Sequence, residues 1–318
     1  MIKIVALDGY TMNPGDLSWQ EIGMLGALEV YNRSTLAQAR ERVIDTDIII
    51  VNKFVVDAAF LDQCNSLKLV CVSATGYNNV DIKECKKRKI TVCNVSNYST
   101  TGVAQHTFAL LLHWLNQIGK HNNLVKKGYW SICPDFSFTA SPIQELSGKI
   151  FGILGYGDIG KRVAQIAKSF GMEVLVCRKS DTPILEDGIQ KVDFETLLKE
   201  SDILSLHANL DNSTSKIINK DSLSKMKKSA ILINTSRGGL INELDLAEYL
   251  REEFISAALL DVLTEEPAPL NHPFYQIRNC KITPHVAWAT VQSRSRLIKG
   301  VEENISAFLE GNPKNEIN

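Results

Sequence analysis

The chain has 318 residues, of which 44% are hydrophobic and 22% charged, and this length is enough for two packed α/β domains. With 35 basic and 36 acidic residues its net charge is −1, so bulk charge gives no reason to expect a nucleic-acid or membrane partner.

Residues 1–95 alternate apolar strand patterns with amphipathic helical patterns. This alternation predicts a parallel sheet covered by helices on both faces. The expected strands are Lys3–Leu7, Ala27–Tyr31, Asp47–Val51, Leu69–Val72 and Thr91–Asn94, and the expected helices are Leu36–Val43, Asp57–Cys64 and Val80–Lys87. This half has no glycine fingerprint for a nucleotide, so we expect it to bind the substrate.

One long helix is expected over residues 99–127, capped by Ser99 or Thr100, and it would bridge two α/β units. The segment Gly128–Gln144 that follows is irregular and aromatic, with Tyr129, Trp130, Phe136 and Phe138. We interpret these aromatic side chains as a packing or dimer contact, and the alternative is an aromatic lid near an active site.

A glycine-rich turn follows the apolar strand pattern Ile150–Leu154. Gly155 permits a tight turn, Gly157 leaves room for a pyrophosphate, and Gly160 lets the next helix lie close to the strand. The free N–H groups at the start of that helix attract an anion. Because a second apolar strand, Met172–Cys177, follows one helix later, this G-x-G-x-x-G spacing predicts a dinucleotide site.

The second α/β unit is expected to begin at residue 148. Its further strands are expected at Val174–Cys177, Ile203–Leu206, Ala230–Asn234, Ser256–Leu260 and Lys281–Thr283, and its helices at Ile159–Phe170, Phe194–Lys199, Lys220–Met226, Leu244–Leu250 and Thr290–Leu309. The long final helix is expected to cross back to the first domain.

Three strand ends of this unit carry chemically active side chains. Arg237 follows one strand and precedes two glycines, and its guanidinium is a planar fork that matches a carboxylate. Glu266 and His285 follow two other strands, with His285 expected at the start of the last helix. A carboxylate on one ring nitrogen would favour the protonated imidazole and make the other nitrogen a general acid. The alternatives are a structural Arg that ties down a loop and a structural His.

Several motifs occur in a recognisable order. They are Gly9-Tyr10 through Asp16-Leu17-Ser18-Trp19, Ala74-Thr75-Gly76-Tyr77-Asn78-Asn79-Val80-Asp81, the glycine fingerprint at 155–160, Asn234-Thr235-Ser236-Arg237-Gly238-Gly239, Asp261 to Glu266-Pro267, and Thr283-Pro284-His285. On these motifs the chain resembles the D-isomer-specific 2-hydroxyacid dehydrogenases, and it is most similar to their glycerate dehydrogenase / hydroxypyruvate reductase branch.

This resemblance implies two Rossmann-like, doubly wound parallel-sheet α/β domains with a cleft between them. The substrate-binding domain would be discontinuous, residues 1–99 plus 287–318, and the dinucleotide-binding domain would be residues 100–286. The family's members are usually homodimers, so a homodimer is expected.

The resemblance also implies roles for individual residues. Arg237, Glu266 and His285 correspond to the catalytic residues. The substrate carboxylate would be held by N–H groups of Thr75 and Gly76, with Asn52 nearby. Trp288 is interpreted either as a wall of the substrate pocket or as simple packing. The expected cofactor contacts, besides Gly155, Gly157 and Gly160, are Asp158, Ile159, His207, Ala208, Thr214, Thr235, Ser236 and Asp261.

Two positions depart from common patterns. Asn209 stands where the family often has Pro, which leaves the shape of that turn open. NAD-preferring folds place an acid about 20 residues after the glycines, and here Arg178, Lys179 and Ser180 come before the first acid, Asp181. These side chains suit a 2′-phosphate, so we predict NADPH over NADH, with NAD still possible. The alternative is that Arg178 points to solvent or stacks on the adenine without selecting.

The predicted activity is reversible reduction of a small 2-keto acid, such as hydroxypyruvate or glyoxylate, to D-glycerate or glycolate. The alternatives are a D-lactate- or D-3-phosphoglycerate-type dehydrogenase or, in a different class, a non-catalytic nicotinamide-sensing protein. The seven cysteines are scattered and never spaced C-x-x-C, so neither disulfides nor a metal site is expected. With no signal peptide and no long apolar run, the expected location is cytoplasmic, without membrane contact.

Overall fold

The chain divides into two compact units in the computed structural model, which describes residues 1–180 and 186–318. The first unit combines Met1–Ser99 with Trp288–Asn318, and the second is the continuous segment Thr100–Ala287. The predicted domain boundaries lie at 99/100 and 286/287. Within the described residues, no helix is both long and apolar enough to cross a bilayer.

A five-stranded parallel sheet forms the middle layer of the first unit, with strand order β2-β1-β3-β4-β5. The strands are β1 (Lys3–Ala6), β2 (Ala27–Val30), β3 (Ile48–Val51), β4 (Leu69–Val72) and β5 (Thr91–Asn94). Every residue of β3 and β4 is buried because helices cover both faces of the sheet, which explains why these strands are apolar throughout.

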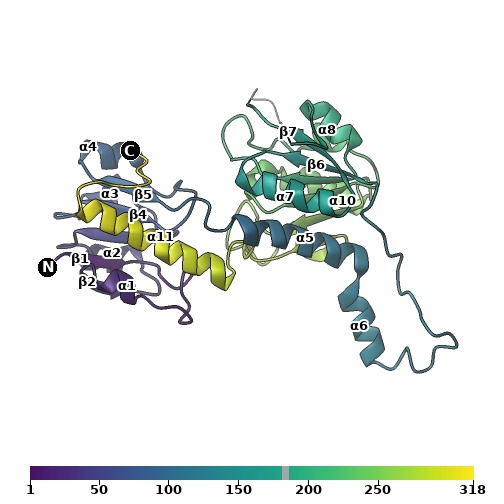
Figure 1. Ribbon diagram of the computed structural model, residues 1–318, viewed down its shortest axis with the longest axis horizontal. Helices are drawn as coiled ribbons and strands as arrows, with labels where there is room; N and C mark the ends of the chain where they lie inside the picture. The colour runs from purple at the N-terminus through teal and green to yellow at the C-terminus, as the bar shows by residue number, and fades with distance from the viewer. Residues whose placement is uncertain (181–185) are drawn as a thin grey trace. The chain divides into compact units, whose positions relative to one another are not determined.

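The helices of the first unit lie on two sides of its sheet. On one side are α2 (Leu36–Arg42), α3 (Ala58–Leu61) and α4 (Ile82–Lys87), and on the other are α1 (Gln20–Gly23) and the final helix α11 (Val291–Leu309). Figure 1 shows α11, in yellow, lying along the strands of the N-terminal part. Buried side chains of α11 such as Leu297, Val301 and Ile305 join the core on that face.

A seven-stranded parallel sheet forms the second unit, with strand order β12-β11-β10-β9-β6-β7-β8. The strands are β6 (Ile150–Leu154), β7 (Glu173–Cys177), β8 (Ile189–Lys191), β9 (Ile203–Leu206), β10 (Ile231–Asn234), β11 (Ala257–Leu260) and β12 (Cys280–Ile282). The strand order reverses at β6, which has β7 on one side and β9 on the other. Ligands of open α/β sheets bind at such a reversal, outside the carboxyl ends of the strands.

Helices cover both faces of this sheet as well. The helices α5 (Thr100–Asn116) and α7 (Asp158–Ser169) share one face and lie side by side in Figure 1. The other face carries α8 (Phe194–Glu200), α9 (Lys220–Leu223) and α10 (Glu243–Arg251). Two parallel-sheet α/β domains are therefore present, which confirms the predicted fold class.

The predicted single helix over residues 99–127 is wrong, because the structure has two helices there. The helix α5 ends at Asn116, Gln117 has a left-handed backbone with φ of 50°, and α6 spans Ile118–Lys126. The apolar stripe that holds α5 on the sheet ends at Leu115, and no residue of α6 is buried. The core therefore ends where the chain turns.

The last helix starts one residue after the predicted bound of Thr290, and the expectation that the stretch with His285 leads directly into it is wrong. That helix begins at Val291, so His285 lies in the preceding loop. Four short elements were not anticipated: α1, β8, and the 3-10 turns η1 (Gly238–Leu240) and η2 (Pro273–Gln276).

Candidate active site

A short contact joins the two acid–base side chains of the second unit. Nδ1 of His285 lies 2.6 Å from Oε2 of Glu266, and both side chains are only partly exposed, 23% and 34%. They follow the neighbouring strands β12 and β11, so both come from the carboxyl edge of the sheet. Because the carboxylate occupies Nδ1, the other ring nitrogen, Nε2, is the one left to exchange a proton with a substrate.

The loop that carries His285 is held by Asp261, the residue directly after β11. The backbone carbonyl of Asp261 accepts the N–H of His285 at 2.8 Å, and its carboxylate accepts the N–H groups of Val286 and Ala287 at 2.9 and 2.8 Å. Burial raises the pKa of Asp261, but the hydrogen bonds it receives outweigh this and hold its pKa below the usual value. The carboxylate therefore stays charged and keeps these amides in place.

The loop that carries Glu266 is fixed from two directions. Oε1 of Glu266 accepts the N–H of Leu263 at 3.0 Å, so the side chain folds back onto its own loop. Glu243, from α10, accepts the N–H of Thr264 at 2.8 Å, and its other oxygen lies 3.3 Å from Nε2 of the buried His272. These bonds orient the carboxylate that meets His285.

Arg237 follows β10, the strand next to β11, and is half-buried. Its Nη1 donates to the carbonyl of Ser236 at 2.7 Å. The next residue, Gly238, packs so closely on the loop of Glu266 that a Cβ would lie 2.0 Å from the carbonyl carbon of Leu263. Sequence reasoning connected these glycines with a ligand edge, and the structure adds that Gly238 holds the Arg237 loop against the Glu266 loop.

The glycine turn after β6 leaves room for an anionic cofactor group. Gly155 has φ of +95°, and a Cβ there would lie 2.6 Å from the backbone of His207 and Ala208. A Cβ on Gly160 would lie 2.3 Å from the carbonyl oxygen of Gly155, so the helix α7 packs directly on the turn. In contrast, a Cβ on Gly157 would have no neighbour within 4 Å. This open space lies at the start of α7, where N–H groups favour a phosphate, so these residues fit a dinucleotide.

The ends of β9 and β10 border the same turn. The N–H of His207 donates to the carbonyl of Leu154 at 2.7 Å, and Ser236 Oγ donates to the carbonyl of Ala208 at 2.8 Å. Burial lowers the pKa of His207 to about 4, so its ring, 2.8 Å from Ser205 Oγ, is neutral at neutral pH. A neutral ring adds no charge beside the glycine turn.

Two threonines of the predicted cofactor set bond within the protein. Thr214 Oγ1 donates to the carbonyl of Asn209 at 2.6 Å and closes the turn whose shape the sequence left open. Buried Thr235 lies 3.3 Å from the hydroxyl of Thr107 on α5. Asp158 and Ile159 begin the helix α7 beside the open space at Gly157.

The basic side chains after β7 are held by neighbours. The guanidinium of Arg178 lies 5.7 Å from the ring centre of Tyr156, which belongs to the glycine turn. Lys179 Nζ forms a 2.8 Å ion pair with Asp211, and this pairing contributes to a pKa of Asp211 below its usual range. Arg178 thus lies beside the glycine turn, and Lys179 is paired with Asp211. Ser180 follows at the surface, and Asp181 lies outside the described residues.

The predicted substrate residues of the first unit follow β3 and β4, neighbouring strands of its sheet. Asn52 is buried and donates to the carbonyl of Ser73 at 2.6 Å, while Thr75 and Gly76 lie in the loop after β4. Asp8, just after the end of β1, accepts the N–H groups of Asn52, Lys53 and Phe54 and so shapes the loop after β3.

Trp288 is the first residue of the chain's return to the first unit, and its ring packs edge-on against Tyr98 with ring centres 6.2 Å apart. This contact fits the packing interpretation of Trp288 and leaves its role as a pocket wall untested. In the described parts of the chain, no group of three or more His, Cys, Asp or Glu side chains is arranged to hold a metal ion. All seven cysteines are free thiols.

Residues 108–287 match the family described as D-isomer specific 2-hydroxyacid dehydrogenase, NAD binding domain. The chain belongs to the D-isomer specific 2-hydroxyacid dehydrogenases. Its relatives in this family include a hydroxypyruvate reductase of Blautia hydrogenotrophica, 41% identical over 321 residues and covering 100% of each chain. A glycerate dehydrogenase of Methylorubrum extorquens is 37% identical over 318 residues, 99% of this chain and 98% of its own.

Among solved structures, an acyclic imino acid reductase in complex with NADPH and D-Arg is 34% identical, with a TM-score of 0.86 and 100% of each chain covered. As a D-isomer specific 2-hydroxyacid dehydrogenase, the protein is an oxidoreductase that acts on CH–OH groups with a nicotinamide cofactor.

Sequence reasoning did not select the residues that support this dehydrogenase site from outside the strand ends. Glu243 accepts the N–H of Thr264, 21 positions later in the chain, and its other carboxylate oxygen lies beside His272, 29 positions later. The only sequence signal for them is a polar residue at a position that turns out to be buried or half-buried.

Proposed function

We propose that this dehydrogenase reduces a small 2-keto acid, such as hydroxypyruvate or glyoxylate, to the D-2-hydroxy acid, with NADPH preferred to NADH. The observation that carries the proposal is the 2.6 Å contact between His285 and Glu266 at the strand edge that also bears Arg237 and the glycine turn. Full-length similarity to a hydroxypyruvate reductase and a glycerate dehydrogenase supports this choice of substrates.

When bound, the nicotinamide supplies the hydride. Nε2 of His285 donates the proton that the carbonyl oxygen of the substrate needs as it becomes a hydroxyl. Glu266 stabilises the positive charge of the imidazole and fixes its orientation through Nδ1. Arg237 provides a guanidinium that binds the carboxylate and stabilises negative charge on the ketone oxygen.

The test is a matrix of NADPH and NADH oxidation against hydroxypyruvate, glyoxylate, pyruvate and 3-phosphohydroxypyruvate. We expect the highest kcat/KM with one of the first two acids. A preference for pyruvate or the phosphorylated acid would replace the proposed substrate, and no turnover of any acid would favour a nicotinamide-sensing protein. Because an imino acid reductase shares the fold at 34% identity, the panel includes each 2-keto acid with an added amine, and turnover that requires the amine would favour that reaction.

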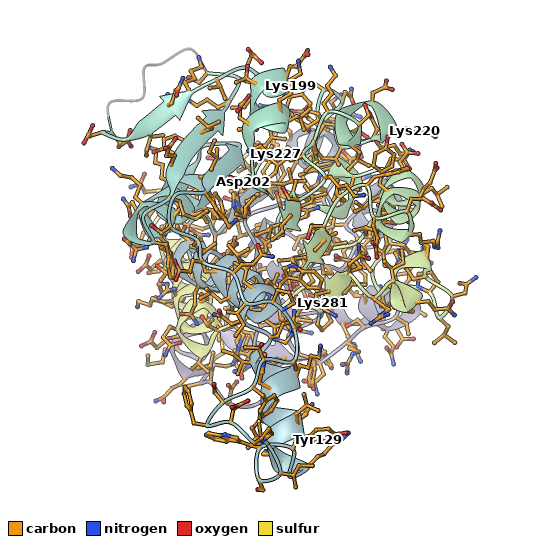
Figure 2. The ribbon with its side chains drawn as sticks, turned by 90° about the vertical axis from the view of Figure 1, so that its right-hand side faces the viewer. Tyr129, Lys199, Asp202, Lys220, Lys227 and Lys281 are labelled. Carbon is orange, nitrogen blue, oxygen red and sulfur yellow. The ribbon has the colours of Figure 1, made fainter. Side chains whose placement is uncertain are left out.

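Cofactor preference is tested with Arg178→Ala. A lost charge-assisted bond to a 2′-phosphate corresponds to about a 10- to 100-fold loss of kcat/KM with NADPH, and the value with NADH should stay within about twofold. Lys199→Ala, which removes an exposed charge on α8 that is labelled in Figure 2, is the matched control. Equal losses with both cofactors, or a higher kcat/KM with NADH in the parent enzyme, would overturn the preference.

We further propose that the enzyme forms a homodimer through α6 and the aromatic segment Gly128–Gln144. We call α6 together with Gly128–Gln144 the arm. Figure 2 places Tyr129 at the far end of α6, where the arm ends. Its aromatic and aliphatic side chains lie outside the core of the unit, with exposures of 54% for Tyr129, 52% for Trp130, 81% for Ile132 and 92% for Phe136. Exposed apolar surface of this extent is typical of an interface.

A second copy of the chain is the proposed occupant because the same unit also carries a hollow of about 540 Å³ beside the base of the arm. Trp114, Lys120, Pro142 and Arg278 are among the residues that line it. A two-fold axis would let each arm meet the matching surface of the other copy. Sedimentation should give twice the monomer mass for the parent and one monomer mass for Trp130→Ser/Phe136→Ser. A monomeric parent would refute this interface.

A further inference from the structure

A side chain from the first long helix of the second unit reaches the loop of the general acid. His106, on α5, has Nε2 2.9 Å from Oγ1 of Thr283 and 3.4 Å from Oδ1 of Asp261. Thr283 Oγ1 in turn donates to Oδ1 of Asp261 at 2.5 Å. Thr283 lies two positions before His285, and all these groups belong to the same compact unit.

The direction of these hydrogen bonds follows from the available protons. A threonine hydroxyl has one proton, and the ionised carboxylate of Asp261 can only accept it. Thr283 Oγ1 must then accept from His106, so Nε2 of His106 carries a proton whatever the charge of its ring. The result is a directed chain from His106 through Thr283 to Asp261, ending on a carboxylate whose side chain is 0% exposed.

The backbone at His285 needs such support. Its φ of 52° is in the left-handed region, which residues with a side chain rarely adopt. Asp261 holds the residues on both sides, since its carboxylate accepts the N–H groups of Val286 and Ala287 as well as the Thr283 hydroxyl. A shift of this carboxylate would therefore move the imidazole relative to Glu266.

We propose that His106, Thr283 and Asp261 form a hydrogen-bonded relay that positions His285 for proton transfer. In this relay His106 is a positioning residue, because it acts through Thr283 and Asp261. The proposal rests on the proposed role of His285, and it assigns a function to a histidine that lies 179 positions earlier in the chain.

The relay is tested at its middle member with a matched pair of variants. Thr283→Val keeps the shape but removes the hydroxyl, so the half-buried His106 and the buried Asp261 each lose a hydrogen bond. We expect kcat to fall about tenfold, with the Kd for NADPH within twofold of the parent. Thr283→Ser restores the hydroxyl and should recover at least half of the parent kcat. His106→Phe should lower kcat about fivefold, and His106→Gln, which retains an N–H donor, should recover most of it.

A second measurement does not depend on turnover. Hydrogen exchange of the peptide covering residues 284–288 reports the amides that Asp261 accepts, and it should be about tenfold faster in Thr283→Val than in the parent or in Thr283→Ser. If the parent reduces no 2-keto acid, the proposed function fails, while this exchange still decides whether the relay holds the loop.

Three results would overturn the relay. The first is unchanged exchange in Thr283→Val. The second is a kcat for Thr283→Val within twofold of the parent. The third is an equal loss of kcat in Thr283→Ser, because the serine hydroxyl would then have failed to rescue the function of the threonine.

Discussion

Glu266→Gln is the sharpest perturbation of the acid–base pair. The glutamine can still accept the N–H of Leu263 through Oε1, so the loop keeps its local bond. The oxygen that faces Nδ1 of His285 is replaced by an amide NH2, which removes both the negative charge and the acceptor for a proton on Nδ1. Charge-assisted hydrogen bonds contribute about 1.5–3 kcal/mol. Because both side chains are partly exposed, at 23% and 34%, the lower part of that range applies, about 1.5–2 kcal/mol. This corresponds to roughly a 10- to 30-fold decrease in kcat.

The assay is steady-state NADPH oxidation with hydroxypyruvate, together with the Kd for NADPH from fluorescence titration. We expect the decrease in kcat with the Kd for NADPH within twofold. Glu265→Gln is the matched control, because the neighbouring Glu265 is also exposed and carries the same charge, and its kcat should equal that of the parent. If Glu266→Gln retains more than half of the parent kcat, Glu266 does not support the general acid.

Three further outcomes follow from particular contacts. Gly238→Ala should lower the free energy of unfolding by about 1–3 kcal/mol in urea, because its Cβ would lie 2.0 Å from the carbonyl carbon of Leu263, and parent-like stability would contradict that packing. Gly157→Ala should keep the parent's unfolding free energy, since a Cβ there meets nothing within 4 Å, yet should weaken NADPH binding severalfold in a titration. The pKa of His207 falls from 6.5 in the unfolded chain to about 4 in the fold, so its contribution to stability is present above pH 6.5 and is lost as the pH falls towards 4. Between pH 6.5 and pH 4 the Tm of the parent should therefore fall more steeply than the Tm of His207→Gln. Parallel plots of Tm against pH for the two proteins would contradict a lowered pKa of His207.

The central strands were predictable because each is a short apolar run that ends at small or polar residues. β4, β5, β6 and β9 have the predicted bounds. The break at Gln117 was not predictable from periodicity, because nothing local marks a left-handed glutamine. It is explained only by where the sheet, and with it the core under α5, comes to an end.

The site divides in the same way. The position of Arg237, Glu266 and His285 after neighbouring strands was predictable, because parallel strands bring their carboxyl ends to one edge. The place of His285 in a loop was not, since that loop is held by the carboxylate of Asp261 and not by its own sequence. The contact of His106 with Thr283 was not predictable, because nothing in the sequence around a helical histidine indicates a hydrogen bond to a threonine 177 positions later.

The return of α11 to the first unit affects the order in which the chain can fold during translation. The segment Thr100–Ala287 is continuous, so it can collapse as soon as it leaves the ribosome. The sheet of the first unit is completed later, because the side chains that cover one of its faces, such as Leu297, Val301 and Ile305, belong to α11, which is translated after the whole second unit. A nascent chain halted before Val291 would leave that apolar face of the sheet exposed to solvent. Chaperones bind exposed apolar surface of this kind.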